Sequence, residues 1–466
     1  MSSDSKEERS GTSLRALARL AWPITVSTLS YSVMTLVDTV LVGHLGPAAL
    51  AGVGLGGIMA FVSLCFSIGL LRGANTLVAQ AVGAGRGQES HGFLGAAIVT
   101  AVGLGLLTIV VGQVAAEVLR HLAATPAAGD AVRTYLRIRI LGAPFALLFI
   151  AFREVRYGQG DSRSPMRATV IANVVNIGLA YLMVFVWRRG VAGAATATVI
   201  AHVVEAGLLA VPQLGNGWGL CALSRNYLRG LWRLGVPLGI QFTLEVGSFA
   251  LLSLLISAMA DVQMAAHQIA LQVIHFSFLP AFAVAEAAAV LVGQAVGAGR
   301  DDLVKRIARL ALRVTSVYTA LWTLALVFGS RLIVSAFTHD QELVATATTL
   351  LHVAAVFQVL DAANLVARAT LRGAGDVRYS AAVGVATSWL CTPPLAWLLG
   401  YRLRLGALGG WLGMCLEIVV GAGLLWSRLE RGAWASAAAA TRVRLMAPAG
   451  SNTVQPGVEG GGAAVA

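Results

Sequence analysis

The heptapeptide Gln80-Ala-Val-Gly-Ala-Gly-Arg86 occurs a second time, unchanged, as Gln294-Ala-Val-Gly-Ala-Gly-Arg300, at an offset of 214 (294 − 80 = 214). Two more landmarks recur at nearly the same offset: Pro23 with Pro237 (237 − 23 = 214), and Gly158-Gln-Gly-Asp161 with Gly373-Ala-Gly-Asp376 (373 − 158 = 215). Matched landmarks in one order indicate that the chain contains two copies of a single structural unit.

The composition places these copies in a lipid bilayer. The 466 residues are 57% hydrophobic and only 12% charged, whereas soluble domains carry about a quarter charged residues. Apolar segments long enough to cross a hydrocarbon layer of about 30 Å are expected at residues 17–43, 48–80, 93–117, 132–156, 166–188, 191–213, 229–259, 263–295, 304–336, 342–370, 379–400 and 405–428. We therefore predict an all-α polytopic membrane protein with twelve transmembrane helices.

The repeat divides these helices into two six-helix lobes. We expect an N-lobe at 17–213 and a C-lobe at 229–428, joined by a cytoplasmic link at 214–228. A cytoplasmic N-terminal tail at 1–16 and a disordered tail at 429–466 complete the predicted organisation. Because six helices separate equivalent points, the lobes are parallel repeats about a pseudo-twofold axis along the membrane normal, which favours a substrate site between them.

The net charge of +12 predicts membrane orientation rather than binding to nucleic acid, because the basic residues gather in alternate loops. Those loops follow the positive-inside rule if both termini are cytoplasmic, as in a multi-pass protein of the bacterial inner membrane. The residues concerned are Arg86, Arg153, Arg156, Arg163, Arg167, Arg225, Arg229, Arg233, Arg300, Lys305, Arg306, Arg309, Arg372 and Arg378. No signal peptide is expected, and the four cysteines have no metal or disulfide spacing.

Two acidic residues in the C-lobe are the strongest site candidates. A carboxylate in hydrocarbon is costly unless it faces protein or water. Glu245 shares a helical face with Gln241, and Asp361 has Gln358 and Asn364 three residues to either side. Together these groups could form an oxygen-rich cage for Na+, or could take up H+ or a cationic substrate.

Other charged or polar residues within the apolar segments have weaker interpretations. Glu286 and Arg72 occupy equivalent positions (286 − 72 = 214), so we hypothesise an ion pair across a cleft between the lobes. We expect Glu205 and Glu417 to be peripheral. His275 is a weak proton ligand candidate, and an apolar drug surface could use Phe61, Phe66, Phe276, Phe278, Met34 and Met264.

Several motifs resemble those of the multidrug and toxic compound extrusion (MATE) family, over residues 20 to 434. They are Pro23 with Val37–Gly46, Leu77–Arg86, Asn173–Leu179 with Gly193–Thr198, Ala265–Ala270, and Leu371–Asp376. The resemblance implies two lobes in a V around a central cleft. It also implies export of amphipathic organic cations by alternating access against inward Na+ or H+, with no cofactor and no enzymatic activity.

The resemblance also assigns cation sites in both lobes. The C-lobe site would use Glu245 and Asp361, and the N-lobe site would use Asp38, Asn176 and Thr198. The family's helix 5 aspartate, expected four residues after Asn176, is Ala180 here. That departure shifts the expected coupling to the C-lobe. Glu245 has no acidic twin in the first half, since position 31 is Tyr31 (245 − 214 = 31).

Two alternative functions stay open. A flippase for a lipid-linked or other amphipathic metabolite would need several basic residues in the cleft, where the sequence predicts only Arg72. An intramembrane enzyme that holds magnesium diphosphate would need paired acidic motifs, and no Asp-x-x-x-Asp pair occurs within an apolar segment. We expect a monomer whose partners are organic cations and the lipid bilayer.

Overall fold

The computed structural model describes residues 13–123, 125–215 and 217–446. Within these ranges, twelve helical segments are long and apolar enough to span a membrane, as predicted. They are α2 (Leu14–Gly43), α3 (Pro47–Gly83), α4 (Ser90–Leu122), α5 with α6 (Pro126–Arg139 and Ala143–Gly158), α7 (Arg163–Tyr181), α8 (Gly190–Ala210), α9 (Arg225–Ser257), α10 (Asp261–Gly297), α11 (Asp301–Ser335), α12 (Gln341–Gly373), α13 (Val377–Leu395) and α14 (Ala407–Arg431).

Local chemistry sets many of the helix ends. Pro47 and Pro126 occupy the first turns of α3 and α5, where a missing N–H costs nothing. The carboxylate of Asp340 accepts hydrogen bonds from the first free N–H groups of α12, as a helix cap does. Gly85 and Gly299, each two residues after the end of α3 or α10, have φ of 74° and 73°, a conformation that glycine adopts without strain.

The two halves repeat in space as well as in sequence. The helices α3 and α10 have the same length, 37 residues, and their first residues are related by the repeat offset (261 − 47 = 214). Each half also contains a π-helical segment, η3 (Leu182–Val186) and η5 (Ala396–Arg402), and the same offset relates their starts (396 − 182 = 214). The predicted pair of six-helix units is therefore confirmed, and even the π-helical segment occurs at the equivalent position in both halves.

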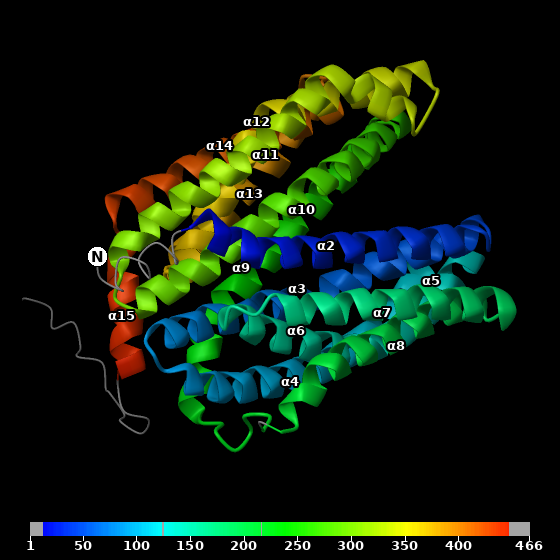
Figure 1. Ribbon diagram of the computed structural model, residues 1–466. Helices are drawn as coiled ribbons and strands as arrows, with labels where there is room; N and C mark the ends of the chain where they lie inside the picture. Colours follow the sequence, from blue (N-terminus) through cyan, green and yellow to red (C-terminus); the bar gives the residue numbers. More distant parts are fainter. Residues whose placement is uncertain (1–12, 124, 216, 447–466) are drawn as a thin grey trace, which may run out of the picture.

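The halves meet at one end of the molecule. Figure 1 shows their ribbons close together where α2 begins and spreading apart toward the other end. We call these the convergent end, which contains Leu14, Gly83 and Gly297, and the divergent end, which contains Gly43 and Asp261. The helices α3 and α10 both cross from one end to the other and pack against each other.

Glycines permit a very close approach at the convergent end. A Cβ added to Gly83 would lie 2.0 Å from the carbonyl oxygen of Gln294, and one added to Gly297 would lie 2.0 Å from that of Gln80. These two contacts are the same contact in the two repeats. Only a residue without a side chain lets the backbones of α3 and α10 touch in this way.

The C-terminal tail corrects one prediction. Instead of being disordered from residue 429, the chain continues in α14 to Arg431 and then forms α15 (Ala435–Met446) at the convergent end (Figure 1). Trp434 and Ala438 are buried against the C-lobe, and Arg442 forms a two-bond ion pair with Asp301, at 2.6 and 2.9 Å. Residues 1–12 and 447–466 of the predicted tails lie outside the described ranges.

Candidate functional site: buried charges in each lobe and between them

Glu245 forms an ion pair inside the C-lobe with an arginine, Arg368, that is not among the predicted site residues. Arg368 Nη1, on α12, lies 2.5 Å from Glu245 Oε1, on α9. The same oxygen accepts a hydrogen bond from Gln241 Nε2 at 3.0 Å. Glu245 is thus partnered by a guanidinium and an amide rather than by Asp361.

Asp361 has a different environment. It is partly exposed, and no hydrogen bond or ion pair reaches its carboxylate from residues 13–123, 125–215 or 217–446. Arg368 lies near enough to act on it electrostatically. Gln358 accepts a hydrogen bond from Ser277 of α10 at 2.7 Å, and Asn364 is buried with its Oδ1 unpartnered within the described chain. The predicted cage is therefore not assembled around Glu245 and Asp361.

Glu417 is a third acid of the same region, and its predicted peripheral place is wrong. It lies on α14, where it accepts a hydrogen bond from the Thr392 hydroxyl. Arg368, Glu245 and Asp361 all act on it electrostatically. Among the described residues, Glu245, Asp361 and Glu417 therefore lie around the guanidinium of Arg368 in this part of the C-lobe.

The predicted N-lobe residues are also buried or half-buried, but only two of them are in contact. Asn176 Nδ2 donates to Thr198 Oγ1 at 3.4 Å. Asp38 Oδ1 and Asn176 Oδ1 are both buried without a hydrogen-bond partner in the described ranges. Ala180, in place of the expected acid, is buried among apolar neighbours. The N-lobe thus offers acceptor oxygens but a single acid at its predicted site.

The predicted ion pair between Arg72 and Glu286 forms across the interface between the halves. Arg72 Nη2 lies 3.4 Å from Glu286 Oε1, and Arg372 Nη2 lies 2.7 Å from Glu286 Oε2. Arg372, assigned above to a loop, is instead within α12 and buried. The guanidinium of Arg72 also lies over the rings of Phe242 and Phe282, 5.6 and 5.1 Å from their centroids.

A second charged pair adjoins this cluster from the N-lobe. Arg153 Nη2 lies 2.7 Å from Glu154 Oε1, and Asn75 Nδ2 donates to Glu154 Oε2 at 3.2 Å. Arg153 and Glu154 both lie on α6, within the segment predicted at 132–156, although Arg153 was grouped above with the arginines of the loops. Among the described residues, two buried glutamates, Glu154 and Glu286, are thus paired with one buried arginine, Arg372, and two half-buried ones, Arg72 and Arg153.

Hydrogen bonds from side chains to backbone carbonyl oxygens also join the two halves at the convergent end. Gln80 Nε2 donates to the carbonyl oxygen of Gly373 at 2.9 Å, and Gln294 Nε2 donates to that of Gly158 at 3.2 Å. Thr76 donates to the carbonyl oxygen of Arg372 at 3.3 Å. Each of these bonds joins one half of the chain to the other.

The remaining candidates are mostly packing groups. Glu205, predicted to be peripheral, is buried in the N-lobe, where Thr169 donates to it at 2.7 Å. His275 lies 3.4 Å from the Ser32 hydroxyl of the other half. Phe61 packs edge-on against Phe242 across the same interface. No group of three acidic, histidine or cysteine side chains in the described ranges is placed to hold a metal ion.

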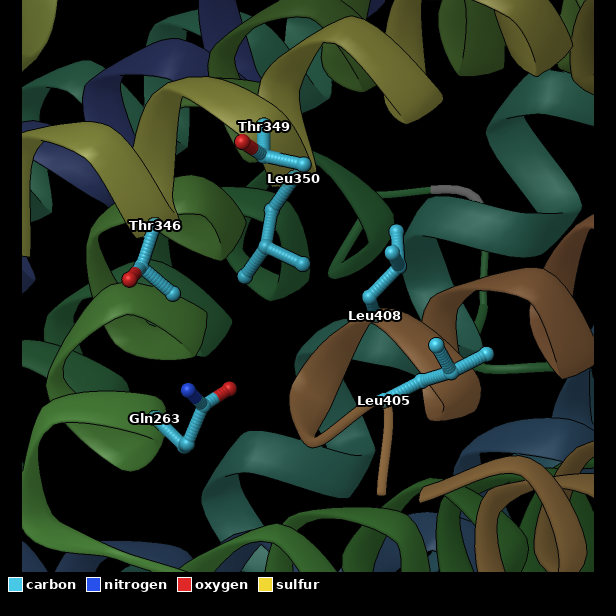
Figure 2. Close-up of a pocket in the computed structure, with 6 residues that line it drawn as sticks. All are labelled: Gln263, Thr346, Thr349, Leu350, Leu405 and Leu408. Atoms are coloured by element: carbon cyan, nitrogen blue, oxygen red, sulfur yellow. The ribbon is translucent and has the colours of Figure 1, made fainter. Parts of the chain in front are cut away.

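A small cavity in the C-lobe lies away from all these residues. Figure 2 shows it near the starts of α10, α12 and α14, at the divergent end, lined by Gln263, Thr346, Thr349, Leu350, Leu405 and Leu408. Its volume is about 170 Å³, below the roughly 300–1,000 Å³ typical of small-molecule sites. None of the predicted site residues lines it, so it is not a candidate for the substrate site.

Comparison with known proteins agrees with this architecture. A family model described as MatE matches residues 23–182 and 237–398, one segment in each half. The probable multidrug resistance protein NorM of Pseudomonas syringae pv. tomato is 30% identical over 422 residues, 86% of this chain and 91% of that protein. That of Rhodopseudomonas palustris is 31% identical over 444 residues, 90% and 93% of the two chains.

Solved structures have the same fold. The crystal structure of the eukaryotic MATE transporter AtDTX14 superimposes with a TM-score of 0.84 at 20% identity, covering 93% of this chain and 98% of that one. The outward-facing conformation of a multidrug resistance MATE family transporter gives 0.83 at 21% identity, covering 90% and 96%. With the family model matching both repeats and relatives similar over nearly their whole length, the chain belongs to the MATE family of membrane transporters.

Proposed function

We propose that the chain is a secondary active antiporter that exports amphipathic organic cations and takes up Na+ or H+ in exchange. Its relatives include several proteins named as probable multidrug resistance proteins. An intramembrane acid is costly and therefore marks an ion or substrate pathway by default. Asp361, Glu245 and Glu417 in the C-lobe and Asp38 in the N-lobe are such acids.

The observation that carries the proposal is a set of buried acceptor oxygens without donors. Among described residues, Asp38 Oδ1 and Asn176 Oδ1 lie in the N-lobe, and Gln241 Oε1 and Asn364 Oδ1 lie in the C-lobe. A buried acceptor costs free energy until something binds it. Na+ is a hard cation that needs several oxygens, and a proton on a nearby carboxyl group would serve as a donor. All four of these oxygens belong to the predicted sites, and one further amide oxygen, Gln80 Oε1 at the convergent end, is also buried without a donor in the described ranges.

The charge distribution supports a direction for transport. The arginine-rich loops adjoin the convergent end, so we place this end and both termini in the cytoplasm of a bacterial cell, by the positive-inside rule. The divergent end then faces outward. The similarity in fold to an outward-facing transporter supports the interpretation that this conformation has a cleft open to the outside.

The contacts at the convergent end would then form the cytoplasmic gate. The Arg72–Glu286 ion pair and the bonds of Gln80 and Gln294 all join one half to the other. An inward-facing state requires the halves to separate at this end, so these bonds would break together. Conversion between two such packed arrangements is the basis of alternating access in repeat transporters.

Reconstituted protein tests the proposal directly. Ethidium export from proteoliposomes should proceed under an imposed Na+ or pH gradient in the wild type, whereas Asp361→Asn and Glu245→Gln should abolish gradient-driven export. Glu342→Gln serves as the control, because this exposed acid lies on the first turn of α12. A folded wild type that exports no ethidium under either gradient would overturn the proposal, and normal export by both variants would remove the C-lobe site from it.

A second candidate is a flippase for an anionic amphipathic metabolite. The three arginines at the interface, Arg72, Arg153 and Arg372, are the feature that favours it. Each of them is bound to Glu154 or Glu286 in this conformation, which leaves less positive charge for a phosphate than the count suggests. Flipping of a fluorescent anionic lipid by reconstituted protein, with no ethidium export, would favour this candidate.

A further inference from the structure

Arg368 is an arginine in the interior of the C-lobe whose partner is a site residue. Its Nη1 lies 2.5 Å from Glu245 Oε1, and both side chains keep some exposure, 24% and 22%. Arginine stays charged at every physiological pH. The carboxylate of Glu245 is therefore paired with a permanently charged group of the protein itself, the guanidinium of Arg368.

Gly384 of α13 makes room for this pair. A Cβ added there would lie 2.3 Å from Glu245 Oε1, 2.9 Å from Gln241 Nε2 and 3.3 Å from Arg368 Nη1. The three polar groups therefore pack against the Cα of Gly384, in the space that a side chain would otherwise fill. An alanine at this position would displace the ends of flexible side chains, not the backbone.

Arg368 has other acids to move to. Asp361 precedes it by seven residues on α12, two turns away on the same face, and has no hydrogen-bond partner within the described part of the chain. The charge of Arg368 acts on both Asp361 and Glu417. One guanidinium therefore acts on three carboxylates and, in this conformation, forms an ion pair with only one of them among the described residues.

The repeat provides an internal comparison. Arg153 is the counterpart of Arg368, at the offset of the Gly158 and Gly373 landmarks (368 − 153 = 215). It pairs with Glu154, whose side chain is only 3% exposed and is also held by Asn75. The two arginines are about equally exposed, 26% for Arg153 and 24% for Arg368, but their partners differ. Glu154 is buried, whereas Glu245 is 22% exposed and therefore accessible to another cation.

We propose that Arg368 is a tethered competitor for the transported cation and sets the affinity of the C-lobe site. The inference rests on the proposed function. An arriving cation takes Glu245, and Arg368 transfers toward Asp361 and Glu417, so one charge enters and one charge moves aside. Return of the guanidinium then expels the bound cation. A transport site must bind strongly enough to load and weakly enough to release.

Equilibrium binding of tetraphenylphosphonium to the purified full-length protein tests this role. Arg368→Met removes the competitor and keeps much of the side-chain volume, so it should bind this cation about tenfold more tightly, which corresponds to about 1.4 kcal/mol. Export by Arg368→Met should show a lower KM and a lower kcat, because release becomes slow. Arg368→Lys should fall between the two. Arg331→Met, at an exposed arginine of α11, should behave as the wild type does.

Carbodiimide labelling followed by peptide mass spectrometry tests the ion pair without relying on transport. These reagents modify carboxyl groups that carry a proton, so Glu245 should resist labelling in the wild type and become labelled in Arg368→Met. Gly384→Ala, which disturbs the pair sterically, should also increase labelling at Glu245. Equal labelling of Glu245 in wild type and Arg368→Met would overturn the inference.

The binding results separate the two proposals. If the wild type binds and exports tetraphenylphosphonium but Arg368→Met has an unchanged or weaker affinity, Arg368 is not a competitor and the antiporter proposal stands. If the wild type exports ethidium but does not bind tetraphenylphosphonium, the inference about Arg368 fails alone; if it neither binds tetraphenylphosphonium nor exports ethidium, both proposals fail.

Discussion

Gln80 and Gln294 make equivalent hydrogen bonds across the interface between the halves, each from its own half to the other. Gln80 donates to the carbonyl oxygen of Gly373 at 2.9 Å, and Gln294 donates to the carbonyl oxygen of Gly158 at 3.2 Å. The repeat offset relates the two donors (294 − 80 = 214) and, to within one position, the two acceptors (373 − 158 = 215). The convergent end is thus held by a pair of matched contacts.

Removal of these two bonds should favour separation of the halves at the convergent end. A hydrogen bond contributes about 1 kcal/mol on average, so Gln80→Ala combined with Gln294→Ala should increase the population of the opposite conformation by roughly ten- to thirtyfold. Labelling of a cysteine placed at Thr76, which lies in the interface, should speed up accordingly. Labelling no faster than in a Thr76→Cys control with both glutamines intact would contradict the prediction.

The two sides of the Arg72–Glu286 ion pair should differ in their importance for stability. Glu286 bonds to two arginines, so Glu286→Gln leaves Arg72 and Arg372 facing each other in a mostly buried place. Loss of one partner from a buried pair costs about 3–5 kcal/mol. Arg72→Met, in contrast, leaves Glu286 with Arg372 at 2.7 Å. The midpoint of thermal unfolding in detergent should therefore fall further for Glu286→Gln.

Charge reversal checks the same pair by a different route. Arg72→Glu combined with Glu286→Arg should recover part of the export and stability lost in the two single variants. If the double variant recovers neither export nor stability, the defects of the single variants do not come from loss of the attraction between Arg72 and Glu286.

The close contact at Gly83 should not tolerate a methyl group. Gly83→Ala places a Cβ 2.0 Å from a backbone oxygen of α10, and overpacking of this kind costs about 1–3 kcal/mol. We expect a lower midpoint of thermal unfolding, or a shift away from this conformation in the cysteine-labelling experiment. Gly103→Ala is the matched control, because nothing lies within 4 Å of the Cβ it adds to α4. Equal behaviour of the two variants would exclude a tight crossing at Gly83.

The helix α15 should loosen when its ion pair is removed. Arg442→Ala breaks the two bonds to Asp301, and a pair this exposed contributes no more than about 1 kcal/mol. Hydrogen exchange of the amides in residues 435–446 should then quicken by up to about fivefold, and added salt should have a similar effect on the wild type. Arg431→Ala, at an exposed arginine just before this helix, should leave the exchange unchanged.

The twelve helices and the repeat could be predicted because they depend on local composition and on identity between distant segments. The ion pairs could not, because a partner on another helix leaves no mark on periodicity. Arg372 and Arg153 looked like loop residues since they lie near the ends of apolar segments, but α12 and α6 continue past them between other helices. Arg368 was the available signal: a lone arginine two turns after Asp361 on the same helical face.

The tail and Glu417 show the same limit. Ala435–Met446 is rich in alanine, which favours a helix once a surface is present to pack against, and the C-lobe supplies that surface to Trp434 and Ala438. The distance of Glu417 from the other acids along the chain says nothing about its place in the bundle. Tertiary packing determined both outcomes.

The reciprocal contacts at the convergent end have the form of an isologous interface. Gly83 meets Gln294 and Gly297 meets Gln80, as residue i meets j and j meets i in a two-fold symmetric dimer. These backbone contacts alone would let a six-helix protein pair with itself, but a dimer of identical halves would lose the Arg72–Glu286 ion pair, because these two residues occupy equivalent positions. The covalent link between α8 and α9 adds a different property: it ensures that each half pairs with its unlike twin. Because the twins are not identical, one repeat pairs its arginine with a buried carboxylate, Glu154, and the other pairs its arginine with an accessible one, Glu245.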